Sequence, residues 1–211
     1  MKIRYFLPAL VLGGVLVAVG CGSSDNNVNG LPENVASISQ VERGRALVIS
    51  GGCSDCHNGG VADPGRAGWL SGYHPGTPGQ PFEIGPFMTY PANLTPDVTY
   101  GLGGFTDLQI FNALRHGLDP EDTPSVVITS ANFPTTPHYL APPMPWPAIR
   151  HFSDEDIWAI VAYLKHGVKA NNNNVPASSG PPDHWASSYT DAAVGPKTIP
   201  TYPAAGEVFN P

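Results

Sequence analysis

The sequence predicts an all-α fold in which three main helices are separated by long irregular loops. Helix-start signals recur at three places, each with a Ser or Thr followed three residues later by an acidic or amide side chain. Apolar residues at helical spacing come after each signal. The 24 glycines and 24 prolines among 211 residues are too many for a chain of regular elements, so most of the remainder is expected to be loop.

The first twenty residues have the pattern of an export signal. Lys2 and Arg4 precede an apolar run over residues 6–19, which is short for a membrane span. The Ala-Val-Gly-Cys sequence that ends at Cys21 resembles a lipobox. It predicts a lipoprotein-type signal peptide over residues 1–20 and lipidation of Cys21. Cleavage at another nearby bond and an uncleaved anchor are the alternatives.

A flexible tether is predicted over residues 21–38, where Ser, Asp, Asn and Gly dominate. The first helix is expected to begin at Ser39, which forms a capping box with Glu42, and to end at the glycine pair 51–52. Gly44 lies in its middle, where glycine costs about 1 kcal/mol relative to alanine. This indicates the close approach of another helix, unless Gly44 lies on an exposed face.

Cys53 and Cys56 follow this helix three residues apart, and His57 comes directly after them. This is the attachment pattern of a c-type haem, in which each sulfur bonds one vinyl group and the histidine becomes the proximal iron ligand. A zinc site would need a second close pair of ligands, and no two of the other histidines lie three to five residues apart. A thioredoxin-like dithiol would need alternating strands and helices, which the sequence lacks. If Cys21 carries lipid, no cysteine is left over, so the motif predicts one haem c per chain.

Two further helices are predicted after a long loop over residues 58–92. One begins at Thr106, which forms a capping box with Gln109, and ends at Gly117. The other begins at Ser153, before three acidic residues that suit the positive end of a helix dipole. Its apolar stripe consists of Ile157, Ile160, Val161 and Leu164, and Gly167 ends it.

The second axial ligand of the iron is expected to be Met144. A low-spin electron carrier needs a second strong ligand, usually Met or His. Besides the first residue, the chain offers only Met88 and Met144. Prolines flank Met144, and their fixed φ angles would hold its thioether with little freedom to lose. Met88, a histidine or an open site are the alternatives.

Over residues 40–168 the chain resembles class I c-type cytochromes, and in particular the single-haem modules of bacterial dehydrogenase cytochrome subunits. The segments that carry the resemblance are 53–57, 90–97, 101–107, 113–117, 142–146 and 152–165. The Asn-Leu-Thr-Pro-Asp sequence over residues 93–97 is the most diagnostic of the subgroup.

The resemblance implies a small cytochrome c fold around a covalent haem, with Gly44 packed against an aromatic residue such as Tyr163 where the first and last helices cross. It also implies that His57 and Met144 ligate opposite faces of the ring, and that a loop proline carbonyl, with Pro64 as the candidate, accepts the His57 ring N–H. Four side chains are candidates to bind the propionates or pack the ring, with plain packing as the alternative: Trp69, Tyr90, Asn93 and Trp146. The chain departs from the family in its long loop over 58–92 and an insert over 119–140.

The organisation predicted for the whole chain is a signal peptide over 1–20, a tether over 21–38, a cytochrome c domain over 39–168 and an Asn- and Pro-rich tail over 169–211. Without the signal, 8 basic residues remain against 17 acidic ones, a formal charge of −9. This argues against nucleic acid as a partner and suits a redox protein with a basic docking patch.

These features predict an exported electron carrier that is no enzyme and is anchored by lipid in a bacterial cell envelope, facing the periplasm or lying in the outer membrane. A dehydrogenase or a terminal reductase or oxidase is the expected partner. One alternative is the electron-accepting cytochrome subunit of a dehydrogenase complex. Another is a haem enzyme or gas sensor with an open iron site.

Overall fold

The computed structural model describes residues 36–58 and 63–179. The predicted signal segment, Cys21 and most of the predicted tail lie outside these ranges. The elements in chain order are α1 (Ile38–Ser50), α2 (Cys53–His57), β1 (Phe82–Ile84), β2 (Phe87–Thr89), η1 (Leu102–Gly104), α3 (Asp107–His116), α4 (Trp146–Ile149) and α5 (Asp154–His166).

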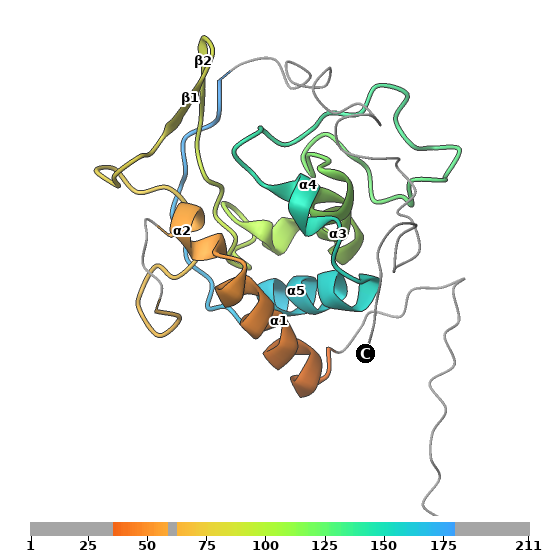
Figure 1. Ribbon diagram of the computed structural model, residues 1–211, viewed down its shortest axis with the longest axis horizontal. Coiled ribbons are helices and arrows are strands. Elements are labelled where there is room, and N and C mark those ends of the chain that lie inside the picture. Colours follow the sequence, from red (N-terminus) through yellow and green to blue (C-terminus); the bar gives the residue numbers. More distant parts are fainter. Residues whose placement is uncertain (1–35, 59–62, 180–211) are drawn as a thin grey trace, which may run out of the picture. The chain divides into compact units, whose positions relative to one another are not determined.

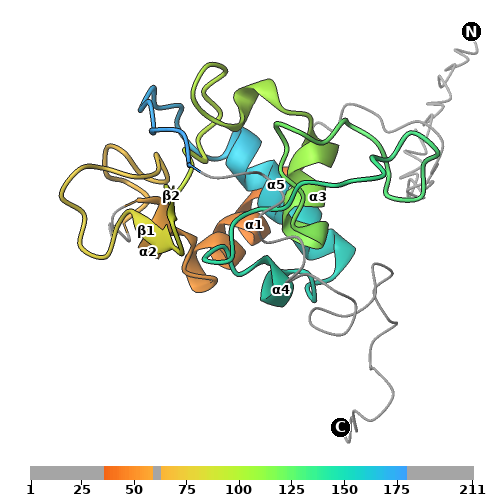
Figure 2. The same cartoon turned by 90° about the horizontal axis from the view of Figure 1, so that it is seen from above.

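The first and last helices, α1 and α5, cross each other (Figures 1 and 2). Gly44 lies at the crossing, against Ala159 and Tyr163. Gly44 is buried, and a β-carbon there would overlap the backbone carbonyl of Ala159 and lie 2.8 Å from Cβ of Tyr163. The expected crossing against Tyr163 is therefore confirmed. It also explains why a residue unfavourable to helices lies in the middle of α1.

Helix α1 begins earlier than predicted. Its N-cap is Ser37, whose hydroxyl accepts a hydrogen bond from the Gln40 backbone N–H at 3.2 Å. Ser39 lies inside the first turn, so the capping box expected at Ser39 and Glu42 is wrong. The sequence offers two serines at suitable spacing, and an extended backbone at Ser37 selects the first.

The caps of α3 and α5 are confirmed. Thr106 and Gln109 form the capping box of α3, and Gly117 ends that helix with φ +68°. Ser153 caps α5 by accepting from the Asp156 N–H at 3.1 Å. All four residues of the predicted apolar stripe of α5 are buried, together with Tyr163.

The core forms where α3 and η1 pack on α5. Ile110, Phe111 and Leu114 of α3 join the buried face of α5. Lys165 ties η1 to α5, because its ammonium donates to the Phe105 carbonyl at 2.7 Å and to the Gly103 carbonyl at 3.3 Å.

The all-α prediction is incomplete because the loop over residues 58–92 contains an antiparallel hairpin. Strands β1 and β2 pair with Phe82 opposite Thr89 and Ile84 opposite Phe87. Each strand has only three residues, and glycines and prolines surround both strands. The segments are therefore too short to show the alternation of apolar and polar residues that predicts a strand.

The end of the segment that follows α5, shown in blue in Figure 1, lies against the hairpin. The Ser179 N–H donates to the Met88 carbonyl at 2.8 Å. This part of the predicted tail is thus fastened to the domain. Within the described ranges, no helix is long and apolar enough to cross a membrane.

Candidate functional site

Helix α2 places Cys53 and Cys56 one turn apart, directly after Gly52, which has φ +68°. Both thiols are half-buried and free of any disulfide. Burial raises the pKa of Cys53 to about 11 and also raises the pKa of Cys56, where the Asp55 charge adds to the effect. A redox-active dithiol needs the opposite shift, because the thiolate is the nucleophile. The environment therefore does not favour the thioredoxin-like alternative.

His57 ends α2 with its ring fixed in one orientation. Its Nδ1 lies 2.7 Å from the carbonyl oxygen of Ala92. Because a carbonyl oxygen only accepts, Nδ1 carries the proton and Nε2 keeps a lone pair. Burial lowers the pKa of His57, and the bond to Ala92 offsets this only in part, which favours the neutral ring. A neutral imidazole with one nitrogen fixed is the form that ligates a metal.

The carbonyl that orients His57 belongs to Ala92, so the expectation that Pro64 supplies it is wrong. The two segments meet because the Gly72 N–H donates to the His57 carbonyl and the Tyr73 N–H donates to the Pro91 carbonyl. Gly72 has φ +83°, and a β-carbon there would lie 2.7 Å from the Ala92 carbonyl carbon. Sequence reasoning missed Gly72, since a lone glycine in a glycine-rich loop carries no distinct signal.

Two of the predicted haem-environment residues use their polar groups within the protein. Trp69 is buried, and its indole N–H donates to the Tyr163 hydroxyl at 3.1 Å. Asn93 donates both amide protons, to the carbonyls of Asn171 at 2.8 Å and Asn173 at 3.1 Å. A propionate could recruit these donors only by displacing the bonds that they already make.

Tyr90 and Tyr73 form an edge-to-face pair with ring centroids 5.0 Å apart. Tyr90 follows strand β2 and is half-buried. Its ring is thus placed by an aromatic neighbour. Packing against a haem edge stays a prediction for this residue.

Met144 lies in a tight turn just before α4. Its N–H donates to the Ala141 carbonyl at 3.0 Å, and its carbonyl accepts from the Trp146 N–H at 2.8 Å. The side chain is half-buried and packs against the same apolar core as Cys53. The other candidate, Met88, lies in strand β2.

Trp146, the first residue of α4, is buried against the end of α3. A β-carbon on Gly117 would overlap the Trp146 ring. The Tyr139 ring stacks on the Trp146 ring with their centroids 6.2 Å apart. The Arg150 guanidinium lies 5.8 Å from the Trp146 ring centroid. Trp146 therefore anchors the turn that carries Met144.

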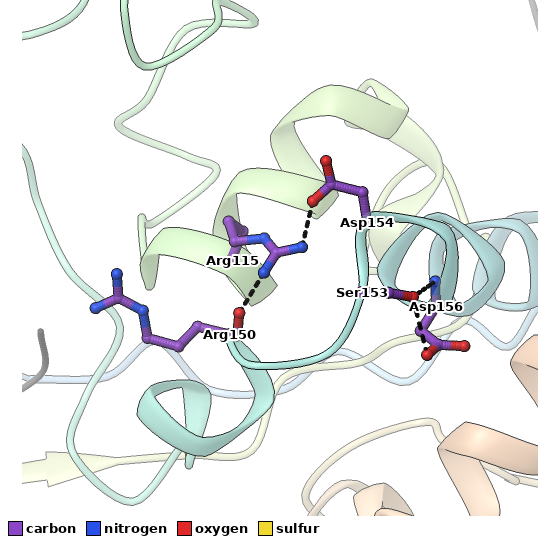
Figure 3. A network of polar contacts seen from close by, with 5 residues as sticks. All are labelled: Arg115, Arg150, Ser153, Asp154 and Asp156. Carbon is purple, nitrogen blue, oxygen red and sulfur yellow. Dashed lines mark hydrogen bonds and ion pairs between the residues drawn. The ribbon is translucent and has the colours of Figure 1, made fainter. Parts of the chain in front are cut away.

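A buried arginine joins α3 to the start of α5, as Figure 3 shows. Arg115 donates to the carbonyl of Arg150 and to the carboxylate of Asp154. The Arg150 side chain points away from Arg115 in the same view. This network fixes the chain between α4 and α5, and hence the end of the Met144 loop.

His74 and His138, which lie outside α2, have polar partners. His74 Nε2 lies 2.8 Å from the Ser71 hydroxyl, and His138 pairs with Asp122 at 2.9 Å. Across residues 36–58 and 63–179, no group of three or more His, Cys, Asp or Glu side chains could hold a metal ion.

The chain is similar to cytochrome c subunits of bacterial dehydrogenases, so the predicted resemblance is confirmed. It is 30% identical over 172 residues to the fructose dehydrogenase cytochrome subunit of Gluconobacter japonicus, covering 79% of this chain and 29% of that protein. It is 31% identical over 138 residues to the gluconate 2-dehydrogenase cytochrome c subunit of Pantoea cypripedii, covering 65% and 25%.

A third relative is named as a dihaem protein. The dihaem cytochrome c-type of Cereibacter sphaeroides is 28% identical over 134 residues, covering 63% of this chain and 38% of that protein. The matches thus span between a quarter and two fifths of the length of these three relatives. No protein-family model matches the chain.

Proposed function

Since the chain is homologous to the cytochrome c subunits of bacterial dehydrogenases, we propose that it is a single-haem electron-transfer cytochrome. A c-type haem supplies one-electron chemistry by cycling its iron between Fe(II) and Fe(III). In this proposal Cys53 and Cys56 bond the ring, His57 is the proximal ligand and Met144 is the distal ligand. The observation that carries the proposal is the His57 ring, oriented by the Ala92 carbonyl at the end of a helical turn with two free thiols.

The residues of α2 fit a covalently held ring. The two thiols lie on one helical turn, and Cys53 packs against the apolar core, which suits a thioether bond to an apolar group. The Ala92 carbonyl holds the His57 ring so that Nε2 is the nitrogen available to iron. One Cys-x-x-Cys-His motif occurs in the sequence, which supports one haem per chain.

The Met144 turn supports a second, protein-supplied ligand. Backbone hydrogen bonds on both sides of Met144, together with the buried Trp146 ring, restrain the thioether. A restrained ligand loses little entropy when it binds, and it keeps the same coordination in both oxidation states. Electron transfer is faster when the ligand set does not rearrange, so this arrangement favours a carrier over an open-site enzyme.

Cysteine variants test covalent attachment directly. The chain is expressed with c-type haem maturation, and the haem content per chain is measured by pyridine haemochrome absorbance and intact mass. We expect one covalently bound haem per chain in the wild type. We expect no covalently bound haem in the Cys53→Ser/Cys56→Ser variant, because both sulfur atoms are gone. Cys21→Ser is the matched control and keeps its haem. A wild-type chain without covalent haem overturns the proposal.

The same Cys21 variant tests export as a lipoprotein. We propose that residues 1–20 are removed and that Cys21 carries lipid, because the lipobox-like sequence ends there. Metabolic labelling with a fatty acid is expected to mark the wild type and to miss Cys21→Ser. Labelling that persists in the variant contradicts the lipid site.

The second candidate function is the electron-accepting subunit of a dehydrogenase complex. The relatives named above are subunits of dehydrogenases, which favours such a partner. The formal charge of −9 suits docking on a basic surface. Copurification of a dehydrogenase from native membranes supports this candidate, whereas a lone haem protein supports the independent carrier. Binding of carbon monoxide to the reduced protein would instead indicate an open iron site.

A further inference from the structure

The segment that follows α5 turns every second residue toward the domain. Asn171, Asn173 and Val175 are half-buried, whereas Asn172 and Asn174 are exposed. This alternation is that of extended backbone with one face against the protein. The asparagine run is therefore divided into two inward-facing and two outward-facing side chains.

Asn173 fastens this segment to the loop around Gly72. Its amide group donates to the Ser71 carbonyl at 2.8 Å and to the Tyr73 carbonyl at 2.9 Å. Its own backbone N–H donates to the side-chain oxygen of Asn171 at 3.0 Å. Asn171 thus orients Asn173, and both amide protons of Asn173 bond the carbonyls on either side of Gly72.

The same segment also holds the loop that contains Ala92. The Asn171 N–H donates to the Thr95 hydroxyl at 3.0 Å, and the Asn171 carbonyl accepts from the Asn93 amide at 2.8 Å. Asn93 and Thr95 are 3% and 0% exposed, so water does not compete for these bonds. Asn93 is the residue next to Ala92.

These two loops meet at His57. The Tyr73 N–H donates to the Pro91 carbonyl at 2.9 Å, and the Gly72 N–H donates to the His57 carbonyl. Between them, the Ala92 carbonyl accepts the His57 Nδ1 proton at 2.7 Å. Anything that shifts either loop changes this last bond.

We propose that Asn171 and Asn173 are positioning residues for His57, which clamp the two loops so that the Ala92 carbonyl keeps its bond to the His57 ring. The inference rests on the proposed function, in which His57 ligates haem iron. A firm bond at Nδ1 increases the electron density that Nε2 offers to the iron, which stabilises Fe(III) and lowers the midpoint potential. A loosened clamp should therefore raise the potential.

The test compares holoprotein variants of the full chain. Asn173→Ala removes both clamp donors, and Asn171→Ala removes the single bond that orients Asn173. Asn172→Ala and Asn174→Ala are the matched controls, since these asparagines lie in the same segment and face outward. The measurements are the midpoint potential, the exchange rate of the His57 Nδ1 proton by NMR and the thermal unfolding midpoint.

We expect a more positive potential for Asn173→Ala, a smaller shift of the same sign for Asn171→Ala and no shift for the controls. In Asn173→Ala, the weakened clamp should make exchange of the His57 Nδ1 proton roughly tenfold faster, the factor that corresponds to the net free energy of about one hydrogen bond. A lower unfolding temperature with unchanged potential and exchange shows a merely structural role and overturns the inference, as does an equal shift in the controls. Absence of covalent haem in the wild type overturns the proposed function instead, so the two failures are distinguishable.

Discussion

Gly44 and Ala159 meet backbone to backbone where α1 crosses α5. A β-carbon on Gly44 would overlap the Ala159 carbonyl, and it would lie 2.8 Å from Tyr163 Cβ. Neither obstacle is the mobile end of a side chain, so the helices themselves would have to separate. The crossing therefore requires a residue without a β-carbon at position 44.

Gly44→Ala is predicted to destabilise the fold. Overpacking at this crossing should lower the free energy of unfolding by about 3 kcal/mol, against about 1 kcal/mol that alanine adds through helix propensity. Urea denaturation followed by circular dichroism measures the net loss. Gly104→Ala is the control, because its β-carbon would meet no heavy atom closer than 3.4 Å. Equal stability of the two variants would contradict the close crossing.

Gly117→Ala is predicted to disturb the Met144 turn through Trp146. Gly117 has φ +68° and faces the indole ring, whereas Gly85 has φ +60° with nothing within 4 Å. Both alanine variants carry the cost of a left-handed backbone, about 1–2 kcal/mol. Only Gly117→Ala should also weaken the sulfur-to-iron charge-transfer band of the ferric protein. If both variants keep that band unchanged, Trp146 does not anchor the turn.

Met144→Ala is predicted to abolish that charge-transfer band and to lower the midpoint potential, because a thioether ligand stabilises Fe(II) relative to Fe(III). Met88→Ala is the matched control, since Met88 lies in strand β2. Visible absorption of the ferric protein and a redox titration provide the measurements. A band that survives in Met144→Ala and disappears in Met88→Ala would move the ligand to Met88.

The ion pair between Arg43 and Asp156 is predicted to stabilise the fold at neutral pH and to lose this effect at acidic pH. The guanidinium lies 2.5 Å from the carboxylate and lowers the pKa of Asp156, through its hydrogen bond first and its charge in addition. Stability from a carboxyl with a lowered pKa is full above its ordinary value and is lost as the pH falls through the lowered value.

Arg43→Met should therefore be less stable than the wild type at pH 6, and the difference should be smaller at pH 2. Urea denaturation at both pH values measures it. Arg45→Met is the control, because Arg45 is exposed on the same helix. A difference that persists unchanged at pH 2 would assign the effect to lost packing of the Arg43 stem.

Local signals predicted the features that depend on neighbours in the chain. The capping box at Thr106, the N-cap at Ser153 and the apolar stripe of α5 follow from spacing, and the structure has all three. The start of α1 was predicted wrongly at Ser39, whereas Ser37 is the N-cap. The hairpin strands were too short to show alternation.

The attachment motif was readable from the chain alone, because Cys53, Cys56 and His57 need only one helical turn to come together. The tertiary structure alone decided what orients His57. Ala92 lies 35 residues later, between Pro91, which accepts from the Tyr73 N–H, and Asn93, which donates to the Asn171 carbonyl. Backbone carbonyls carry no residue-specific signal, so a partner that is a carbonyl becomes visible only once the loops are packed.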